Sequence, residues 1–259
     1  MTGNQTPITL AGRTALVTGG ASGIGLAVAA LFRTLGATVV VSDLNLEPPP
    51  DLPGDYVHGD VRSEADVERM VAAAAGIGRG RLDIAVNCAG ISDQLVPTVE
   101  QDAETWQRVV DISLRGTYLV CREAGRRMLA QRAGALINIS SVTAASGFPR
   151  RTAYGPAKAG VELLTRSLAC EWGAQGVRVN CIAPGYIATP LVEALCRRQE
   201  LDEGRLQQRT PLGRLGRPEE IARAAAFLVS DWAAFITGAV LAVDGGWTAF
   251  GGAGDIASA

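Results

Sequence analysis

The stretch VTGGASGIG, residues 17–25, organises the N-terminal third of this chain. A short apolar run, Thr14 to Val17, comes before it, and an alanine- and leucine-rich helical pattern over residues 23–35 follows directly. Glycines let a backbone turn tightly and approach a pyrophosphate, while the free amides and dipole of a helix N-terminus favour its negative charge. The loop residues expected to bind a dinucleotide are Gly19, Ser22, Gly23 and Ile24. The alternative is a glycine-rich turn that binds nothing.

The rest of the chain continues this alternation of short apolar runs and longer helical patterns. The predicted strands are Thr14–Val17, Thr38–Ser42, Asp55–His58, Ile84–Asn87, Ala135–Ser140, Arg178–Ile182 and Ala239–Val243. The predicted helices cover residues 23–35, 63–75, 102–132, 152–174 and 218–229, with a break expected near Gly116. This order predicts an α/β, Rossmann-like doubly wound fold, with a seven-stranded parallel sheet and helices on both faces.

Composition narrows the function classes. A length of 259 residues and 47% apolar content suit one domain over residues 1–259, ending in a small-residue tail, Gly251–Ala259, that could be mobile. The net charge of −2 and scattered arginines argue against nucleic-acid binding. No run of 18 apolar residues and no basic start before an apolar stretch occurs, so neither membrane insertion nor secretion is expected.

The cysteine and histidine content indicates the compartment and argues against a metal site. The five cysteines form no CxxC motif and lie in apolar or helical runs, as buried reduced thiols do, so we expect a cytoplasmic protein. The single histidine, His58, cannot supply a multi-histidine metal site, and no metal is expected. At the end of a short strand, His58 is interpreted as a half-buried structural residue.

Asp43 ends the second predicted strand, 18 residues past Gly25. A carboxylate at this distance can accept both adenosine ribose hydroxyls and would repel a 2′-phosphate. Neither Ser22 nor Leu44 is the basic residue that a 2′-phosphate would favour. We therefore predict NAD rather than NADP; the alternative is a surface aspartate at a strand end.

Lys158 is the only lysine in the chain, against 23 arginines, and it follows Tyr154 by four residues. On a helix this spacing puts the two side chains on one face, with Cβ atoms about 5–6 Å apart. A compact positive charge there would favour phenolate over phenol, which makes Tyr154 a candidate acid and base near neutral pH. The alternative is an ordinary surface helix pair.

Together these motifs resemble the short-chain dehydrogenase/reductase family, from about Arg13 to Trp247. TGGASGIG (18–25) matches its TGxxxGxG loop, NCAG (87–90) is similar to its NNAG segment, and YGPAK (154–158) matches its YxxxK signature. Ser141 stands 13 residues before Tyr154, where the family has its catalytic serine. PGYIAT (184–189) resembles the PGxxxT stretch, and GRPEE (216–220) and DGG (244–246) resemble the family's C-terminal end.

Two positions qualify the resemblance. Ser113 stands where the family usually has asparagine, a residue that helps hold a water linking the lysine to solvent, so we expect a surviving but weakened proton relay. Pro156 lies inside the YxxxK motif, and proline is tolerated only in the first turn of a helix. The helix is therefore expected to begin close to Tyr154.

The resemblance implies a role for each matching residue. The implied catalytic residues are Ser141, Tyr154, Lys158 and Ser113. Besides the loop residues, Asp43, Tyr154 and Lys158, the implied cofactor-binding residues are Asp60, Val61, Asn87, Ala89, Gly90, Pro184, Gly185, Ile187 and Thr189. The resemblance also implies a homotetramer, with the helices at 102–132 and 152–174 packed against their copies.

The function expected is NAD(H)-dependent interconversion of a secondary alcohol or polyol and its ketone. The alternative is a non-catalytic NAD-binding scaffold or sensor; enoyl reduction is disfavoured because it usually goes with a wider tyrosine-to-lysine spacing. The substrate is expected between residues 92–98, 142–151 and a lid at about 186–210. The apolar lid suits a medium-sized alcohol, although Asp93 and Gln94 could equally bind a polyol. The pairs Arg150-Arg151 and Arg197-Arg198 could bind a carboxylate, but solvated side chains are favoured.

Overall fold

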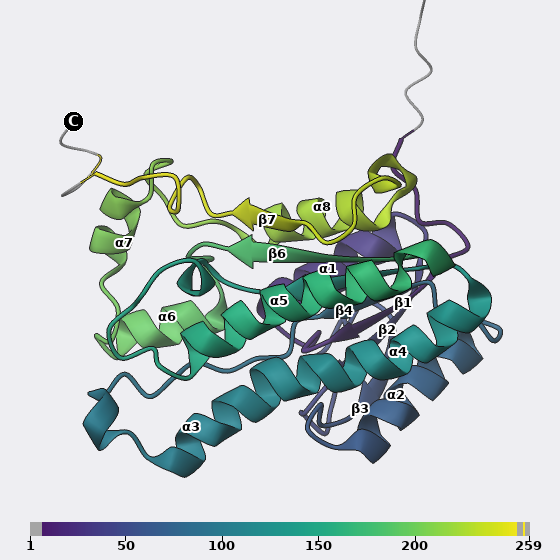
Figure 1. Ribbon diagram of the computed structural model, residues 1–259, viewed down its shortest axis with the longest axis horizontal. Coiled ribbons are helices and arrows are strands. Elements are labelled where there is room, and N and C mark those ends of the chain that lie inside the picture. Colours follow the sequence, from purple (N-terminus) through teal and green to yellow (C-terminus); the bar gives the residue numbers. More distant parts are fainter. Residues whose placement is uncertain (1–6, 253–255, 257–259) are drawn as a thin grey trace, which may run out of the picture.

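The computed structural model describes residues 7–252 and 256, and these form a seven-stranded parallel sheet between two layers of helices (Figure 1). The strand order is β3-β2-β1-β4-β5-β6-β7. The strands are β1 (Thr14–Thr18), β2 (Thr38–Asp43), β3 (Asp55–His58), β4 (Ile84–Asn87), β5 (Gly134–Ile139), β6 (Val177–Pro184) and β7 (Val240–Val243). The chain therefore builds outward from β1 to β3 and then restarts on the other side of β1, which opens a crevice at the carboxyl ends of β1 and β4.

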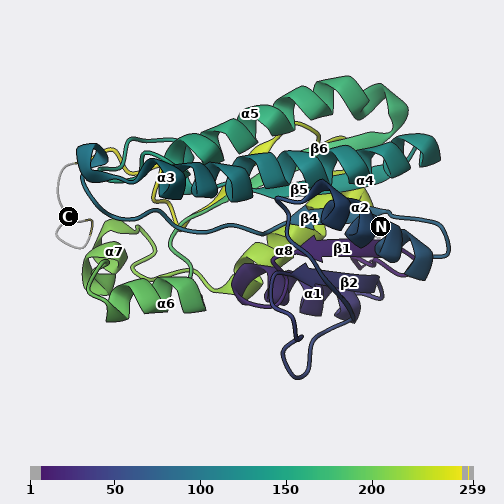
Figure 2. The same ribbon diagram turned by 90° about the horizontal axis from the view of Figure 1, so that it is seen from below.

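The helices are divided between the two faces of the sheet (Figure 2). They are α1 (Gly23–Thr34), α2 (Glu64–Ile77), α3 (Ala103–Val110), α4 (Thr117–Gln131), α5 (Tyr154–Trp172), α6 (Pro190–Arg197), α7 (Glu203–Arg209) and α8 (Pro218–Val229). Phe32 of α1 and Ile221 of α8 share one buried core, whereas Met70 of α2 and Met128 of α4 belong to a second. In β1, Ala15 and Val17 face the first core and Leu16 the second, as the period of two in a strand requires.

The predicted seven-stranded sheet is confirmed, with small changes at the strand ends. β5 ends at Ile139 rather than at Ser140, and β6 extends to Pro184 rather than ending at Ile182. Residues 186–210, expected as a lid, form the two short helices α6 and α7 beyond the carboxyl ends of the strands. His58 is half-buried, as expected.

The long helix does not break at Gly116. A π-helical segment, Asp111–Gly116, joins α3 to α4 without interruption. Gly116 is buried, and a Cβ atom there would lie 2.7 Å from Cγ2 of Val61. The glycine therefore allows close packing against the loop after β3 instead of ending a helix.

The five cysteines differ in burial. Cys121 and Cys181 are buried, and burial raises the pKa of both thiols, but Cys170 is exposed at the surface of α5 and corrects the expectation that all five are buried.

Most of the tail Gly251–Ala259 lies outside the described residues. Within the described part of the chain, no helix has the length and apolarity needed to cross a membrane.

Candidate active site

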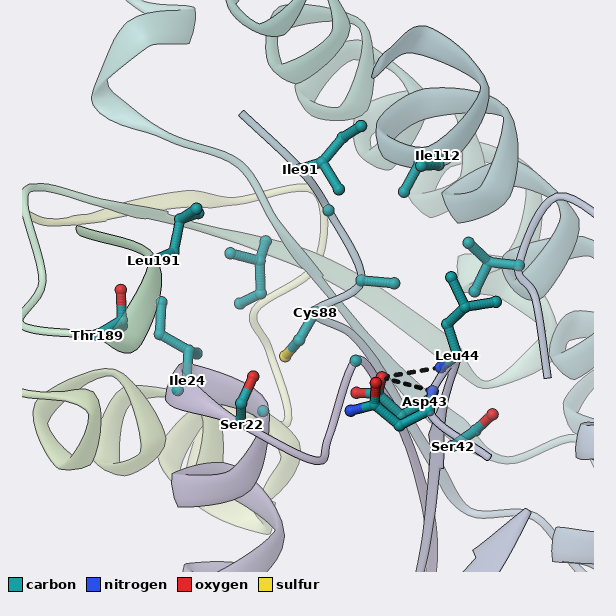
Figure 3. Close-up of a pocket in the computed structure, with 18 of the residues that line it drawn as sticks. Ser22, Ile24, Ser42, Asp43, Leu44, Cys88, Ile91, Ile112, Thr189 and Leu191 are labelled. Atoms are coloured by element: carbon teal, nitrogen blue, oxygen red, sulfur yellow. Dashed lines mark hydrogen bonds between the residues drawn. The ribbon is translucent and has the colours of Figure 1, made fainter. Parts of the chain in front are cut away.

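A cleft of about 410 Å³ lies at the carboxyl ends of the central strands. Parts of segments 19–25, 42–45, 59–61, 88–91 and 189–191 line it, together with Ile112, Ile139, Tyr154 and Lys158. Figure 3 shows Asp43 at one end of this main cleft and Ile24 and Leu191 at the other. The glycine loop, the predicted ribose-binding acid and the Tyr154-Lys158 pair therefore share one elongated cavity.

The glycine loop packs too closely for larger residues. Gly19 has φ +62, and a Cβ atom there would lie 2.7 Å from the backbone nitrogen of Ala89. A Cβ atom on Gly25 would lie 2.2 Å from the carbonyl oxygen of Gly19. These contacts bring the N-terminus of α1 directly to the cleft, with its free amides available to an anion.

Asp43 is held at the edge of the cleft by backbone amides. Its Oδ2 accepts a hydrogen bond from the amide of Ala21 at 3.1 Å. Its Oδ1 accepts a hydrogen bond from the amide of Leu44 at 2.8 Å, which is drawn in Figure 3. The carboxylate therefore links the end of β2 to the glycine loop and faces the space beside that loop.

Asp60 and Val61 line the next part of the cleft, as implied by the resemblance. Asp60 accepts a hydrogen bond from Nε of Arg62 at 2.9 Å. The Arg62 guanidinium lowers the pKa of the Asp60 carboxyl, so this residue is ionised at neutral pH. Val61 contributes an apolar surface to the cleft, and Gly116 packs closely against the Val61 side chain.

Tyr154 is the first residue of α5, as the proline at position 156 predicts, and Lys158 lies one turn later. Nζ of Lys158 lies 5.4 Å from the centroid of the Tyr154 ring. The lysine side chain is only 4% exposed, and its Nζ donates a hydrogen bond to the carbonyl oxygen of Ile139 at 2.7 Å. A buried positive charge, anchored by the end of β5, thus lies beside the phenol.

Ser113 belongs to the π-helical segment and is completely buried, outside the lining of the main cleft. A Cβ atom placed on Gly90 would lie 3.7 Å from Oγ of Ser113 and 3.6 Å from Nζ of Lys158. Both polar groups therefore approach the same glycine. Oγ of Ser113 has no hydrogen-bond partner among the described residues. A buried hydroxyl of this kind normally has a partner, and a bridging water would provide one.

Asp93, which the sequence left open as one of two residues that could bind a polyol, instead binds the backbone at the start of α5. Its carboxylate is buried and accepts hydrogen bonds from the backbone amides of Ala153 at 3.2 Å and Tyr154 at 3.1 Å. Burial raises the pKa of Asp93, while these amides act to lower it. The N-cap residue of α5, Ala153, has no side-chain acceptor. Asp93 supplies the acceptor instead, and so caps the helix at Tyr154, the candidate acid and base.

A second pocket, of about 90 Å³, adjoins the main cleft and shares Tyr154 and Leu191 with it. Ser141 lies in the lining of this side pocket, and its Oγ accepts a hydrogen bond from the amide of Thr143 at 3.2 Å. The apolar wall consists of Val142, Leu191, Val192, Leu195 and Leu201. Arg151 and Tyr186 complete the polar part of the lining.

Several predicted cofactor-binding residues lie elsewhere. Asn87 is buried in the sheet and does not line the main cleft, because its Nδ2 donates to Oδ1 of Asn138 at 2.8 Å. Pro184 and Ile187 are buried outside the cleft lining, and Gly185 lines the side pocket. Ala89, Gly90 and Thr189 do line the cleft, and Thr189 also caps α6 by accepting a hydrogen bond from the amide of Val192.

The apolar wall of the main cleft was largely missed by sequence reasoning. Ile91, Ile112, Ile139 and Leu191 come from four separate segments and carry no common motif. Leu191 was accessible to prediction, because it lies in the apolar stripe of the expected lid.

Comparison with known proteins agrees with this geometry. A family model described as enoyl-(acyl carrier protein) reductase matches residues 19–248. Cis-4-hydroxycyclohexanecarboxylate dehydrogenase of Sinomonas cyclohexanicum is 44% identical over 92% of this chain and 97% of its own length. D-threitol dehydrogenase of Mycolicibacterium smegmatis is 41% identical over 92% of this chain and 94% of its own length.

A solved structure of a short-chain type dehydrogenase/reductase from Mycobacterium ulcerans superposes with a TM-score of 0.86 at 38% identity, covering 93% of this chain and 91% of that one. Both the sequence relatives and this structure span nearly the full length of the chain. The chain belongs to the short-chain dehydrogenase/reductase family and is an oxidoreductase of the secondary-alcohol type.

Proposed function

We propose that this protein is an NAD(H)-dependent dehydrogenase that interconverts a secondary alcohol, which could be a polyol, and its ketone, with Tyr154 as general acid and base. The observation that carries the proposal is the buried ammonium of Lys158 at 5.4 Å from the Tyr154 ring, in the same cleft as the glycine loop. The ammonium and the phenol therefore lie together at the wall of the cleft, where both can act on a bound alcohol.

The main cleft fits a nicotinamide dinucleotide. The close packing of Gly19 and Gly25 forms a cradle that a Cβ atom would fill, next to the N-terminus of α1. Asp43 faces the same space with a carboxylate suited to ribose hydroxyls, which supports NAD over NADP. The chemistry that the nicotinamide supplies when bound is hydride transfer.

The protein's own groups move the proton and orient the substrate. In oxidation, the phenolate of Tyr154 takes the proton from the carbinol oxygen, and in reduction the phenol returns it. The hydroxyl of Ser141, in the side pocket that Tyr154 also lines, holds the substrate oxygen. Ser113, whose hydroxyl near Lys158 has no partner in the part of the chain that the structure describes, continues the path for protons away from the site.

The relatives named above act on a hydroxycyclohexanecarboxylate and on D-threitol. The apolar wall of the side pocket favours the first kind of substrate, a compact alicyclic or aliphatic secondary alcohol, over a polyol. The burial of Asp93 supports the same preference, because this carboxylate is not free to bind a polyol. We further propose that the protein is one domain, acts in the cytoplasm and forms a homotetramer.

The test is an absorbance assay of reduced nicotinamide with NAD and NADP in parallel. The panel includes cis-4-hydroxycyclohexanecarboxylate, cyclohexanol and D-threitol. Tyr154→Phe is expected to lose turnover by about 100-fold or more while still binding NAD. Tyr118→Phe, at an exposed tyrosine of α4, is the matched control. NAD binding by the wild type with no turnover of any alcohol or ketone would instead support the scaffold alternative.

A further inference from the structure

The side pocket contains a charge that hydride transfer between an alcohol and a ketone does not require. Of the described residues that line this pocket, Arg151 alone is charged. It shares the pocket lining with leucine and valine side chains, mainly from α6. Placing a guanidinium beside apolar side chains costs free energy unless an acceptor compensates for lost hydration, so its position needs an explanation.

The protein itself satisfies this guanidinium only in part. Nη1 of Arg151 donates a hydrogen bond to Oγ of Ser92 at 2.6 Å. No carboxylate among residues 7–252 and 256 forms an ion pair with it; the nearby Asp93 uses its oxygens to cap α5. A guanidinium has five N–H donors. Donors remain for a planar, bidentate anion, and a carboxylate matches that geometry.

The other arginines considered from the sequence are arranged differently. Arg197 and Arg198 lie near Glu193 and Glu200, at 3.8 and 3.0 Å, on the outside of the lid. Arg150 is exposed, with φ +62, and lies outside the pocket lining. The expectation that both arginine pairs are solvated therefore fails for Arg151, which is half-buried and faces the pocket.

Arg151 is also near the reacting groups. Its carbonyl oxygen accepts a hydrogen bond from the amide of Gly155 at 3.1 Å, so it lies directly before the first turn of α5. Burial raises the pKa of the Tyr186 phenol, and the charge of Arg151 opposes this effect, which is consistent with both side chains facing the same small space. A pocket of about 90 Å³ leaves room for only a compact molecule between Arg151 and Tyr154.

We propose that Arg151 is an anion-binding residue of the substrate pocket, which takes a hydroxy acid or the corresponding keto acid with a compact apolar body. The carbinol or carbonyl oxygen lies at Ser141 and Tyr154, and the apolar body lies against α6. In oxidation, the phenolate of Tyr154 takes the O–H proton while the carbinol C–H bond breaks and the carbon becomes a carbonyl; bound NAD⁺ would supply the acceptor for the hydride. The carboxylate remains unchanged at Arg151 and fixes the orientation. This inference rests on the proposed dehydrogenase function.

The test compares two probes of nearly equal shape, cis-4-hydroxycyclohexanecarboxylate and the corresponding carboxamide, with NAD. The wild type is expected to prefer the carboxylate by about tenfold or more in kcat/KM, since truncating a charged hydrogen-bonding partner has effects of this order. Arg151→Gln, which keeps a donor for Ser92 but removes the charge, is expected to abolish the preference. Arg151→Lys is expected to retain part of it, and Arg150→Gln, at the exposed neighbour, to leave it intact.

Equal kcat/KM values for the two probes in the wild type, or a preference that survives in Arg151→Gln, overturn the inference but leave the dehydrogenase intact. Absence of turnover for every alcohol in the panel overturns the proposed function instead. If Arg151→Gln does not fold, as judged by circular dichroism, inhibition of the wild type decides. Cyclohexanecarboxylate must then inhibit at about one-tenth of the concentration needed with cyclohexanecarboxamide; equal inhibition contradicts the proposal.

Discussion

Asp43 joins two functions in one carboxylate, because it holds the glycine loop through Ala21 and faces the space proposed for a ribose. Asp43→Asn keeps an acceptor for the Ala21 amide but removes the charge. We expect kcat/KM with NAD to fall by about tenfold or more. The ratio of kcat/KM with NAD to kcat/KM with NADP should also fall, because the repulsion of a 2′-phosphate is lost.

The measurement is kcat/KM with each dinucleotide on one saturating alcohol. Glu47→Gln, at an exposed acid just beyond the same strand, is the control for a general change in surface charge. A variant that keeps the wild-type ratio of NAD to NADP would show that Asp43 has only the structural role.

Asp93 acts through the backbone of Tyr154 and is a positioning residue. Asp93→Ala removes the acceptor of two amides at the start of α5, so kcat is expected to fall by about 10- to 100-fold with little change in the KM for NAD. The free energy of unfolding is expected to fall by about 1 kcal/mol, as for other lost helix caps.

Steady-state kinetics and urea denaturation measure the two effects. Gln94→Ala, at the exposed neighbour, is the control, and Asp93→Asn, which keeps one acceptor oxygen, should recover part of kcat. Loss of stability with kcat unchanged would limit Asp93 to a structural role.

The site residues that could be predicted are those whose partners lie near them in the sequence. The loop residues and the pair Tyr154-Lys158 carry spacing that a strand-loop-helix unit or a helical turn explains. Asp93 and Tyr154 meet only because the segment after β4 passes the start of α5, and no local pattern indicates that contact. Asn87 matches a motif, yet its amide faces the sheet, since a motif does not specify which way a side chain turns.

The joined helix α3-α4 shows a glycine used for packing. In Gly116→Ala, the added methyl group would meet Val61, which lines the main cleft, so the KM for NAD is expected to rise. The free energy of unfolding is expected to fall by about 1–3 kcal/mol, as for other overpacked sites. Urea denaturation and the KM for NAD are the measurements.

Gly76→Ala in α2 is the matched control, because an added Cβ atom would meet no heavy atom of the described residues within 4 Å. That variant is expected to gain about 0.4–1 kcal/mol of stability through the reduced entropy of the unfolded chain. An unchanged KM for NAD in Gly116→Ala would contradict the supporting role of this helix.

Glu220 caps α8 and gives stability a defined dependence on pH. It accepts a hydrogen bond from the amide of Arg217 at 2.8 Å and pairs with Arg214 at 2.7 Å. The pKa of the Glu220 carboxyl is lowered to about 2, from 4.5 in the unfolded chain. The main cause is the hydrogen bond from the Arg214 side chain, and the next is the hydrogen bond from the Arg217 amide. The contribution of Glu220 is therefore complete above pH 4.5 and is lost as the pH falls towards 2.

Glu220→Gln is expected to lower the urea midpoint at pH 7, and the difference from the wild type should shrink between pH 5 and pH 3. Glu219→Gln, at an exposed acid in the same turn, is the control. A difference that does not depend on pH would mean that the carboxylate charge contributes nothing to the cap.

At the level of the complete sheet, sequence patterns were sufficient. All seven strands were predicted. The inner strands β1, β2, β4, β5 and β6 read as apolar runs because they are largely buried on both faces, whereas the edge strands β3 and β7 are partly exposed. The π-helical segment and the division of the lid into α6 and α7 were not predicted, since both depend on packing against distant segments.

The surface of α4 and α5 is where we expect copies of the chain to meet. Leu163 of α5 and Tyr118 of α4 are 63% and 44% exposed, so both side chains are available to contact another copy of the chain. Light scattering is expected to give a mass about four times 26.9 kDa. Leu163→Glu should lower that mass, whereas Val99→Glu, at an exposed residue outside these helices, should not. A single-copy mass for the wild type would contradict the tetramer.

The single lysine makes this protein suitable for chemical titration of its own active sites. Only one side-chain amine occurs in the 259 residues, and it is buried beside the phenol. An acylating reagent therefore has no competing lysine on the surface to consume it. Each Lys158 acylated should silence one copy of the chain, so that the extent of labelling at Lys158 itself counts working sites, and saturating dinucleotide should slow the reaction.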